Sequence, residues 1–317
     1  MLEEINRSTL SEFVMCPWCL MHDPLLVKDW DSSVLYIKEH WTKCKKVDSL
    51  VSNLSAITQD SKLMDKLHKV GINELQFSFY GIGETHDWFA GRKGAYADIE
   101  KAVPILQNAG ITLRPIVWLH SKIGSELPLL MDKFNLFGLE LDQGKLPAHI
   151  VDPVGHQLSH PEDRPTREEL IAYANLLPPN IFLWEEGIVC KNVLNGLTMD
   201  GKSKTSKTAG SSFDKNRTED EKLINLMCSY TILPDGEAYP FWEPVAPHFR
   251  LGNVFVDGMD EIHRRYYNGD YEGKRLLEKL NTSELISKYG IAESTKLYSD
   301  PESLMWEYKM KYLKSHN

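Results

Sequence analysis

The sequence predicts an α/β fold: a partial parallel β/α barrel, with a small C-terminal extension made of a β-hairpin and helices. Two patterns predict it. Between residues 47 and 186, short apolar and β-branched runs alternate with segments in which apolar residues recur at helical spacing. Beyond residue 220, a hairpin pattern is followed by amphipathic segments. Strands that alternate with helices of this length form right-handed βαβ units and a parallel sheet.

The individual elements follow from the same periodicities. Strands are expected at residues 47–53, 75–81, 112–120, 136–142 and 180–186. Helices are expected between them at residues 60–71, 94–110, 126–135 and 166–177. Gly71 is placed to end the first helix, and Pro104 lies inside the second and is expected to bend it. Ligands of parallel sheets bind where the strands end at their carboxyl side, so functional residues are expected just after each strand.

The last third of the chain has a different composition. Residues 200–220 are rich in Lys, Ser, Thr and Gly, which predicts a flexible polar loop. Residues 230–241 predict a hairpin with Asp235 and Gly236 at its turn. We therefore expect a barrel domain at residues 1–199, the loop, and a tail with C-terminal helices at residues 221–317.

Composition restricts the classes of function. The net charge of −9 does not favour a uniform nucleic-acid-binding surface, so there is no strong case for a nucleic-acid partner, although a local basic patch stays open. No apolar run is long enough for a transmembrane helix, and the acidic start of the chain does not resemble a signal peptide, so the protein is expected in the cytoplasm. An odd, scattered set of cysteines without an export signal does not indicate a disulfide framework. The cysteines are Cys16, Cys19, Cys44, Cys190 and Cys228.

One short motif has the spacing of a metal or redox site. Cys16 and Cys19 enclose Pro and Trp, and two thiolates at this distance can hold one metal ion or cluster, or form a redox pair. Glu12 precedes Cys16 by four positions. A structural role is equally open, because a buried free cysteine behaves as a small apolar residue and a glutamate in a polar segment is usually solvated.

This motif resembles that of the radical-SAM superfamily, in which Cys-x3-Cys-x-aromatic-Cys holds a [4Fe–4S] cluster and S-adenosylmethionine (SAM) binds its fourth iron. The resemblance implies Cys16, Cys19 and Glu12 as the metal-binding positions, with Glu12 standing where the family has its first cysteine. It also implies a barrel of TIM type and hydrogen-atom abstraction as the reaction.

Further segments match the family in the same order along the chain. Residues 21–26 are similar to its Gly-Gly-Glu-Pro motif, residues 52–54 to the Thr-Asn-Gly that ends its third strand, and residues 76–96 to its fourth strand and loop. The last segment contains a His-Asp pair, an arginine and glycines in sequence. The resemblance implies a set of SAM-binding residues: Asp23, Ser52, Asn53, Ser78 and Arg92. An arginine at this edge also suits a carboxylate through bidentate pairing, although it could equally be a surface residue.

The tail resembles the SPASM or twitch extension of family members that modify peptides and proteins. The matching segments are residues 232–240 and 251–254, with Phe241 where a cysteine normally follows the Tyr-Pro pair. By resemblance, this implies a peptide or protein substrate.

Two alternatives stay open. The incomplete ligand set favours a catalytically inactive radical-SAM-like scaffold that binds a peptide or an active paralogue. His156 and His160 have the i,i+4 spacing of some zinc sites, which would fit a hydrolase, but prolines at 153 and 161 enclose them.

The role of Asp87 also has two interpretations. This residue follows the fourth-strand segment and could stabilise a turn or contact a ligand.

Overall fold

The computed structural model describes residues 23–40, 48–60, 62–151, 163–201, 230–240 and 245–315. It divides the chain into two compact units, which are described one at a time. The first unit contains the described residues 23–151 and 163–183, and the second contains those from 184 onwards. The domain boundaries expected at residues 199 and 220 stay a prediction.

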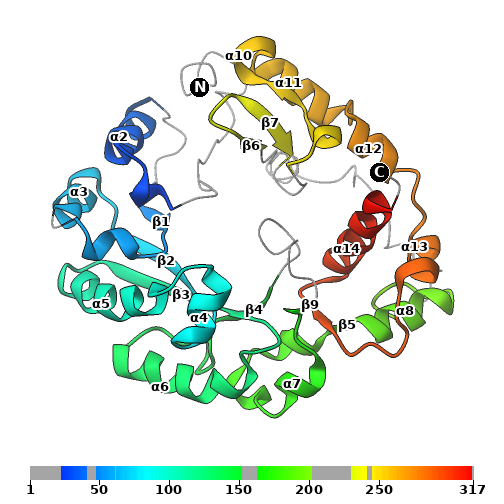
Figure 1. Ribbon diagram of the computed structural model, residues 1–317, viewed down its shortest axis with the longest axis horizontal. Coiled ribbons are helices and arrows are strands. Elements are labelled where there is room, and N and C mark those ends of the chain that lie inside the picture. Colours follow the sequence, from blue (N-terminus) through cyan, green and yellow to red (C-terminus); the bar gives the residue numbers. More distant parts are fainter. Residues whose placement is uncertain are drawn as a thin grey trace, which may run out of the picture. The chain divides into compact units, whose positions relative to one another are not determined.

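The first unit is built on a parallel sheet, which confirms the α/β fold class. The strands pair in the order of the sequence, β1-β2-β3-β4, and every pair is parallel. They are β1 (Ser49–Val51), β2 (Glu74–Phe79), β3 (Thr112–Leu119) and β4 (Ala148–Ile150). Strands that are paired in sequence order, with helices in the connections, are the repeating unit of a partial β/α barrel (Figure 1).

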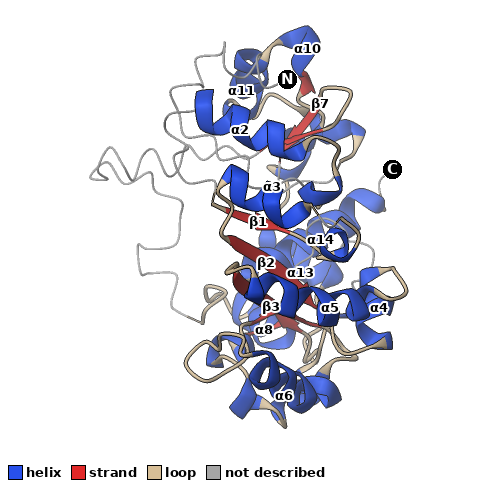
Figure 2. Cartoon of the chain, turned by 90° about the vertical axis from the view of Figure 1, so that its left-hand side faces the viewer, coloured by secondary structure: helices blue, strands red, loops and turns tan. Residues whose placement is uncertain are grey.

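Helices precede β1 and occupy the connections between the strands, and they cover one face of the sheet. They are α2 (Trp30–His40), α3 (Leu63–Val70), α4 (Glu84–Ala90), α5 (Ala95–Asn108) and α6 (Leu127–Phe137), with short 3-10 turns at Pro24–Leu26, Ser55–Thr58 and Gly124–Glu126. Figure 2 shows β1, β2 and β3 side by side, with α3 and α5 in front of them. Gly71 ends α3 in the left-handed conformation, as predicted, at φ 70°. Pro104 lies inside α5.

Alternation along β2 creates the core of this unit. Leu75, Phe77 and Phe79 are buried, while the residues between them are half-buried. The ring of Phe79 lies 5.3 Å from that of Phe134 in α6. Such contacts hold the helices on the sheet, since each buried aromatic side chain contributes on the order of 2 kcal/mol through the area it removes from water.

One expected strand is wrong, and another forms only in part. At residues 136–142, α6 continues to Phe137 and ends at Gly138, and the fourth strand forms at Ala148–Ile150 instead. Leu136 is 74% exposed, whereas Leu139, just after the end of the helix, is buried. At residues 180–186, Pro179–Phe182 form a 3-10 turn, which prolines at the start of the turn favour.

The rest of that second segment belongs to a different sheet. Trp184–Glu185 form β5, which pairs antiparallel with β9 (Leu297–Tyr298) in the second unit. The helix expected at residues 166–177 forms only as α7 (Arg167–Ile171), with a 3-10 turn at Ala174–Leu176. Its start is a capping box, in which Thr166 and Glu169 exchange hydrogen bonds with each other's backbone.

The second unit contains the predicted hairpin. Strands β6 (Tyr230–Ile232) and β7 (Glu237–Pro240) pair antiparallel, and β8 (Gly252–Asn253) joins β7. Gly236 has φ +88°, which explains the glycine at the turn. The helices are α8 (Glu186–Leu194), α10 (Val254–Asp257), α11 (Met259–Tyr267), α12 (Glu272–Leu277), α13 (Thr282–Tyr289) and α14 (Pro301–Lys314).

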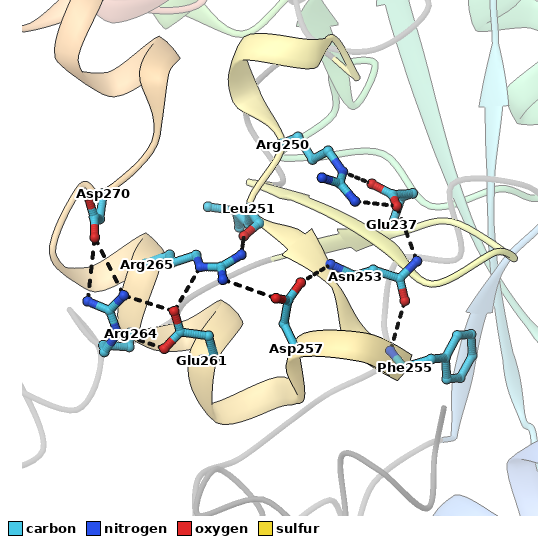
Figure 3. Close-up of polar contacts among 10 residues, drawn as sticks. All are labelled: Glu237, Arg250, Leu251, Asn253, Phe255, Asp257, Glu261, Arg264, Arg265 and Asp270. Carbon is cyan, nitrogen blue, oxygen red and sulfur yellow. Dashed lines mark hydrogen bonds and ion pairs between the residues drawn. The ribbon is translucent and has the colours of Figure 1, made fainter.

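Charged side chains link β7, β8, α10 and α11 on the surface of this unit (Figure 3). Glu261 accepts hydrogen bonds from both Arg264 and Arg265, and Arg265 also pairs with Asp257 at 3.0 Å. These arginines hold the pKa of Glu261 down at about 2, through hydrogen bonds from Arg264 first and Arg265 second. In the described part of the chain, no helix has the length and apolar character needed to cross a membrane.

Candidate functional site

A pocket lies where strands β1 and β2 end at their carboxyl side. It has a volume of about 240 Å³. All five residues that the sequence predicts for SAM binding line it, namely Asp23, Ser52, Asn53, Ser78 and Arg92. The first precedes a 3-10 turn, two follow β1, one lies in β2 and one follows α4. Segments separated by up to about seventy positions are therefore brought together at the edge of the sheet where ligands of parallel sheets bind.

Asp23 is held at the end of β1 by a set of hydrogen bonds. Its Oδ2 accepts from the Ser52 hydroxyl and from the Asn53 backbone amide, both at 2.7 Å. Its Oδ1 accepts from the Leu25 amide at 2.9 Å. Because a carboxylate oxygen accepts two hydrogen bonds, Oδ1 retains one acceptor position among the described residues and Oδ2 retains none.

Burial dominates the electrostatics of this carboxyl group. Desolvation raises the pKa of Asp23 above its ordinary value, although the hydrogen bonds from Ser52, Asn53 and Leu25 each act in the opposite direction. A cationic group placed beside Asp23 would favour its ionised form. The pocket therefore has one position suited to an ammonium group.

The side chain of Ser78 is hydrogen-bonded to the neighbouring strand β3. Its hydroxyl accepts a hydrogen bond of 3.0 Å from the Trp118 indole in the neighbouring strand. Tyr80 follows directly after β2, lines the same pocket and stacks on Phe89 with ring centres 4.8 Å apart. The hydroxyl of Ser78 is therefore oriented by β3, which leaves its role toward a ligand a prediction.

Arg92 lies in the turn between α4 and α5, and its guanidinium is only half paired. Its Nη1 contacts Asp98 at 2.7 Å. Its Nη2 is buried and has no hydrogen-bond partner in the described part of the chain. A buried, unpaired donor on a permanently charged group is unfavourable unless a ligand satisfies it. This atom is the clearest indication in the pocket of an anionic ligand group.

Asp87 stabilises the same turn. Its carboxylate accepts hydrogen bonds from the backbone amides of Gly94 at 2.5 Å and Tyr96 at 2.9 Å. These amides lie at the start of α5, where backbone donors have no partner within the helix. Of the two roles considered for Asp87, the geometry supports turn stabilisation, and through it the placement of Arg92.

His86 was not among the predicted site residues, yet it also lines the pocket. It is 3% exposed, and its Nδ1 accepts a hydrogen bond of 3.1 Å from the Tyr80 amide. Burial lowers its pKa to about 4, so the ring is neutral at pH 7. The His-Asp pair directly after a strand was the available sequence signal, but it does not reveal which of the two residues faces the pocket.

The predicted metal-binding positions Glu12, Cys16 and Cys19 lie outside the described residues, as do Cys44, Cys228, His156 and His160. Within the described residues, no three His, Cys, Asp or Glu side chains are grouped so that they could hold a metal ion. Cys190 is buried in the second unit, where its Sγ lies 3.5 Å from the Tyr308 hydroxyl. Burial raises the pKa of this thiol, which suits a structural residue.

Solved structures similar to this chain include two of anSMEcpe. No protein-family model matches the chain, and no curated protein matches it. The structure of native anSMEcpe with bound AdoMet is similar at 16% identity and a TM-score of 0.43, over 88% of this chain and 76% of that one. The tagged form of anSMEcpe with bound AdoMet is similar at 16% identity and a TM-score of 0.47, over 93% and 77% of the two chains.

Proposed function

We propose that this chain is a radical-SAM-type protein that binds SAM in the pocket at the end of β1 and β2, and that it acts on a peptide or protein substrate by hydrogen-atom abstraction. One observation carries the proposal. Five residues selected along the sequence for their order in the family motifs line a single pocket, and one of them, Arg92, has a buried donor that lacks a partner among the described residues.

The polar groups of the pocket fit the amino-acid end of SAM. Arg92 would pair with the carboxylate through its free Nη2, and Asp23 would accept from the ammonium group through the remaining position on Oδ1. The volume of about 240 Å³ is below the range of about 300–1,000 Å³ that is usual for small-molecule sites, so these residues enclose only part of such a ligand. When bound to a reduced cluster, SAM supplies the radical chemistry.

The residues at the expected cluster site do not complete the set of three cysteine ligands that the family uses. The sequence offers Cys16, Cys19 and Glu12 where the family has three thiolates, and carboxylates are unusual cluster ligands. The substrate class rests on the resemblance of the tail alone.

SAM binding is tested by isothermal titration calorimetry on the full chain. Arg92→Met should weaken SAM binding by about tenfold or more, because it removes a charged donor from a partly buried pair. Arg114→Met is a matched control. Arg114 is the third residue of β3, its side chain is 59% exposed, and it pairs with Glu74. Absence of SAM binding to the wild-type chain would sink the proposal.

The second candidate is a catalytically inactive scaffold that binds a peptide or an active paralogue. Glu12, in the place of the family's first cysteine, is the observation that favours it. Anaerobic reconstitution with iron and sulfide separates the two candidates. About four irons per chain that are lost in Cys16→Ala and Cys19→Ala, and an EPR signal altered by SAM, support the enzyme. SAM binding with no iron above that of the double variant supports the scaffold.

A further inference from the structure

The hydrogen bond to Nδ1 fixes the tautomer of His86. The Tyr80 amide is a donor, so Nδ1 must carry its lone pair, and the single proton of the neutral ring must lie on Nε2. The ring is also held by its neighbours, because its centre lies 5.4 Å from that of Tyr80 and 5.8 Å from that of Tyr96. His86 therefore presents an oriented N–H group.

That N–H group has no hydrogen-bond partner among the described residues, although the side chain lines the pocket and is 3% exposed. Arg92 is close enough for its charge to lower the pKa of His86, with His120 acting the same way and Asp87 opposing them. The Nη2 of Arg92 is buried without a partner among the described residues, and the one hydrogen bond that His86 makes there is at Nδ1, so each of these two pocket-lining side chains retains a donor.

We propose that His86 is a ligand-binding residue of this pocket, and that its Nε2–H and the Nη2–H of Arg92 together hold one carboxylate group of the ligand. The inference rests on the proposed function, which it deepens by naming the group that the pocket selects. Two N–H donors match the two oxygen atoms of one carboxylate, while the charge of Arg92 is already partly balanced by Asp98. A ligand with a neutral or cationic group at this position would leave both donors unsatisfied.

Two substitutions separate a donor role from a merely structural one. In His86→Asn, the side-chain oxygen can still accept from the Tyr80 amide in place of Nδ1, but no donor reaches the Nε2 position. In His86→Gln, the longer side chain brings an N–H to the Nε2 position. Calorimetry on the full-length chain is run with three probes: SAM, decarboxylated SAM and 5′-methylthioadenosine. The last two lack the carboxylate.

The expected result is selective for the carboxylate. His86→Asn weakens SAM binding by about tenfold, as for a hydrogen bond to a charged group, while His86→Gln remains within about threefold of wild type. Neither substitution changes the affinity for decarboxylated SAM or 5′-methylthioadenosine. An equal loss for SAM and decarboxylated SAM overturns the inference and leaves the proposed function intact. So does the reverse order of the variants, with Asn like wild type and Gln weakened.

If the wild-type chain binds none of these probes, the proposed function has failed, and a separate readout decides on His86. L-methionine carries the carboxylate without the nucleoside. In ¹⁵N-resolved NMR spectra, it should shift the Nε2 resonance of His86 in the wild-type chain and not in Arg92→Met. The absence of such a shift overturns the inference as well.

Discussion

The hydroxyl of Ser52 donates a hydrogen bond of 2.7 Å to the carboxylate of Asp23, a residue 29 positions earlier in the chain. The same hydroxyl oxygen accepts from the Leu54 amide at 2.9 Å. Ser52 is 4% exposed, so water cannot easily replace either bond. This side chain therefore connects the segment before α2 to the turn that follows β1, and it shapes one wall of the pocket.

Replacement of Ser52 by Ala should destabilise the first unit. It leaves the Leu54 amide without its partner and removes one hydrogen bond from Asp23, so we expect a loss of about 1–3 kcal/mol in the free energy of unfolding. Urea denaturation followed by circular dichroism measures it. Ser125→Ala, at an exposed position of the 3-10 turn before α6, should change stability by less than about 0.5 kcal/mol. Equal midpoints for the two variants would contradict the structural role of Ser52.

The affinity for SAM should fall as the pH is lowered toward the pKa of Asp23. Burial raises that pKa above its ordinary value, and an ammonium group pairs only with the ionised carboxylate. The decrease therefore begins at a higher pH than an ordinary aspartate would give. Calorimetric titrations over a series of pH values measure it. Asp23→Asn should bind SAM more weakly and with a flat dependence over the same range, and a wild-type affinity that is also flat would argue against contact with Asp23.

Gly81→Ala should disturb the loop after β2. Gly81 has φ +128°, and an added Cβ would lie 2.6 Å from Oε2 of Glu126 and 2.7 Å from Cγ2 of Thr85. Glu126 holds this loop by accepting from the Ile82 amide at 2.7 Å. We expect a loss of about 2–4 kcal/mol, from backbone strain and the displaced carboxylate together.

Gly138→Ala is the matched control for this substitution. Gly138 also has a positive φ, +61°, but an added Cβ would meet no atom within 4 Å. Its cost should stay near about 1 kcal/mol, the left-handed penalty alone. Thermal unfolding of both variants gives the comparison, and an equal decrease in melting temperature would show that the contact with Glu126 does not matter.

In the second unit, Tyr308→Phe should remove a buried hydrogen bond. The Tyr308 hydroxyl donates to Oε1 of Glu186 at 2.5 Å, and the two side chains are 0% and 2% exposed. Without this donor the buried carboxyl group loses a partner, which should cost about 1–3 kcal/mol. Tyr267→Phe serves as the control, because Tyr267 is 62% exposed. In a double-mutant cycle with Glu186→Gln, the two effects should not be additive, and full additivity would contradict a direct pair.

Local sequence patterns predicted most of the elements of the first unit. Apolar residues at helical spacing and Gly71 at its end predicted α3, and alternation in a short run predicted β2, because both signals depend on neighbours a few positions away. The parallel arrangement followed from the alternation of strands and helices. Motif order along the chain selected Asp23, Ser52, Asn53, Ser78 and Arg92, which line one pocket.

Strand partners, hydrogen-bond partners and burial depend on distant segments and became visible only in the folded structure. The run at residues 136–142 has the alternation of a strand, but α6 keeps Phe137 and Gly138 ends the helix, so the strand forms ten residues later at Ala148–Ile150. Trp184–Glu185 pair with a segment more than a hundred positions away. The tautomer of His86 and the free donor of Arg92 likewise depend on which groups surround them. Local periodicity reports which face of an element is apolar, whereas strand partners, hydrogen-bond partners and burial are set by segments that meet only when the chain has folded.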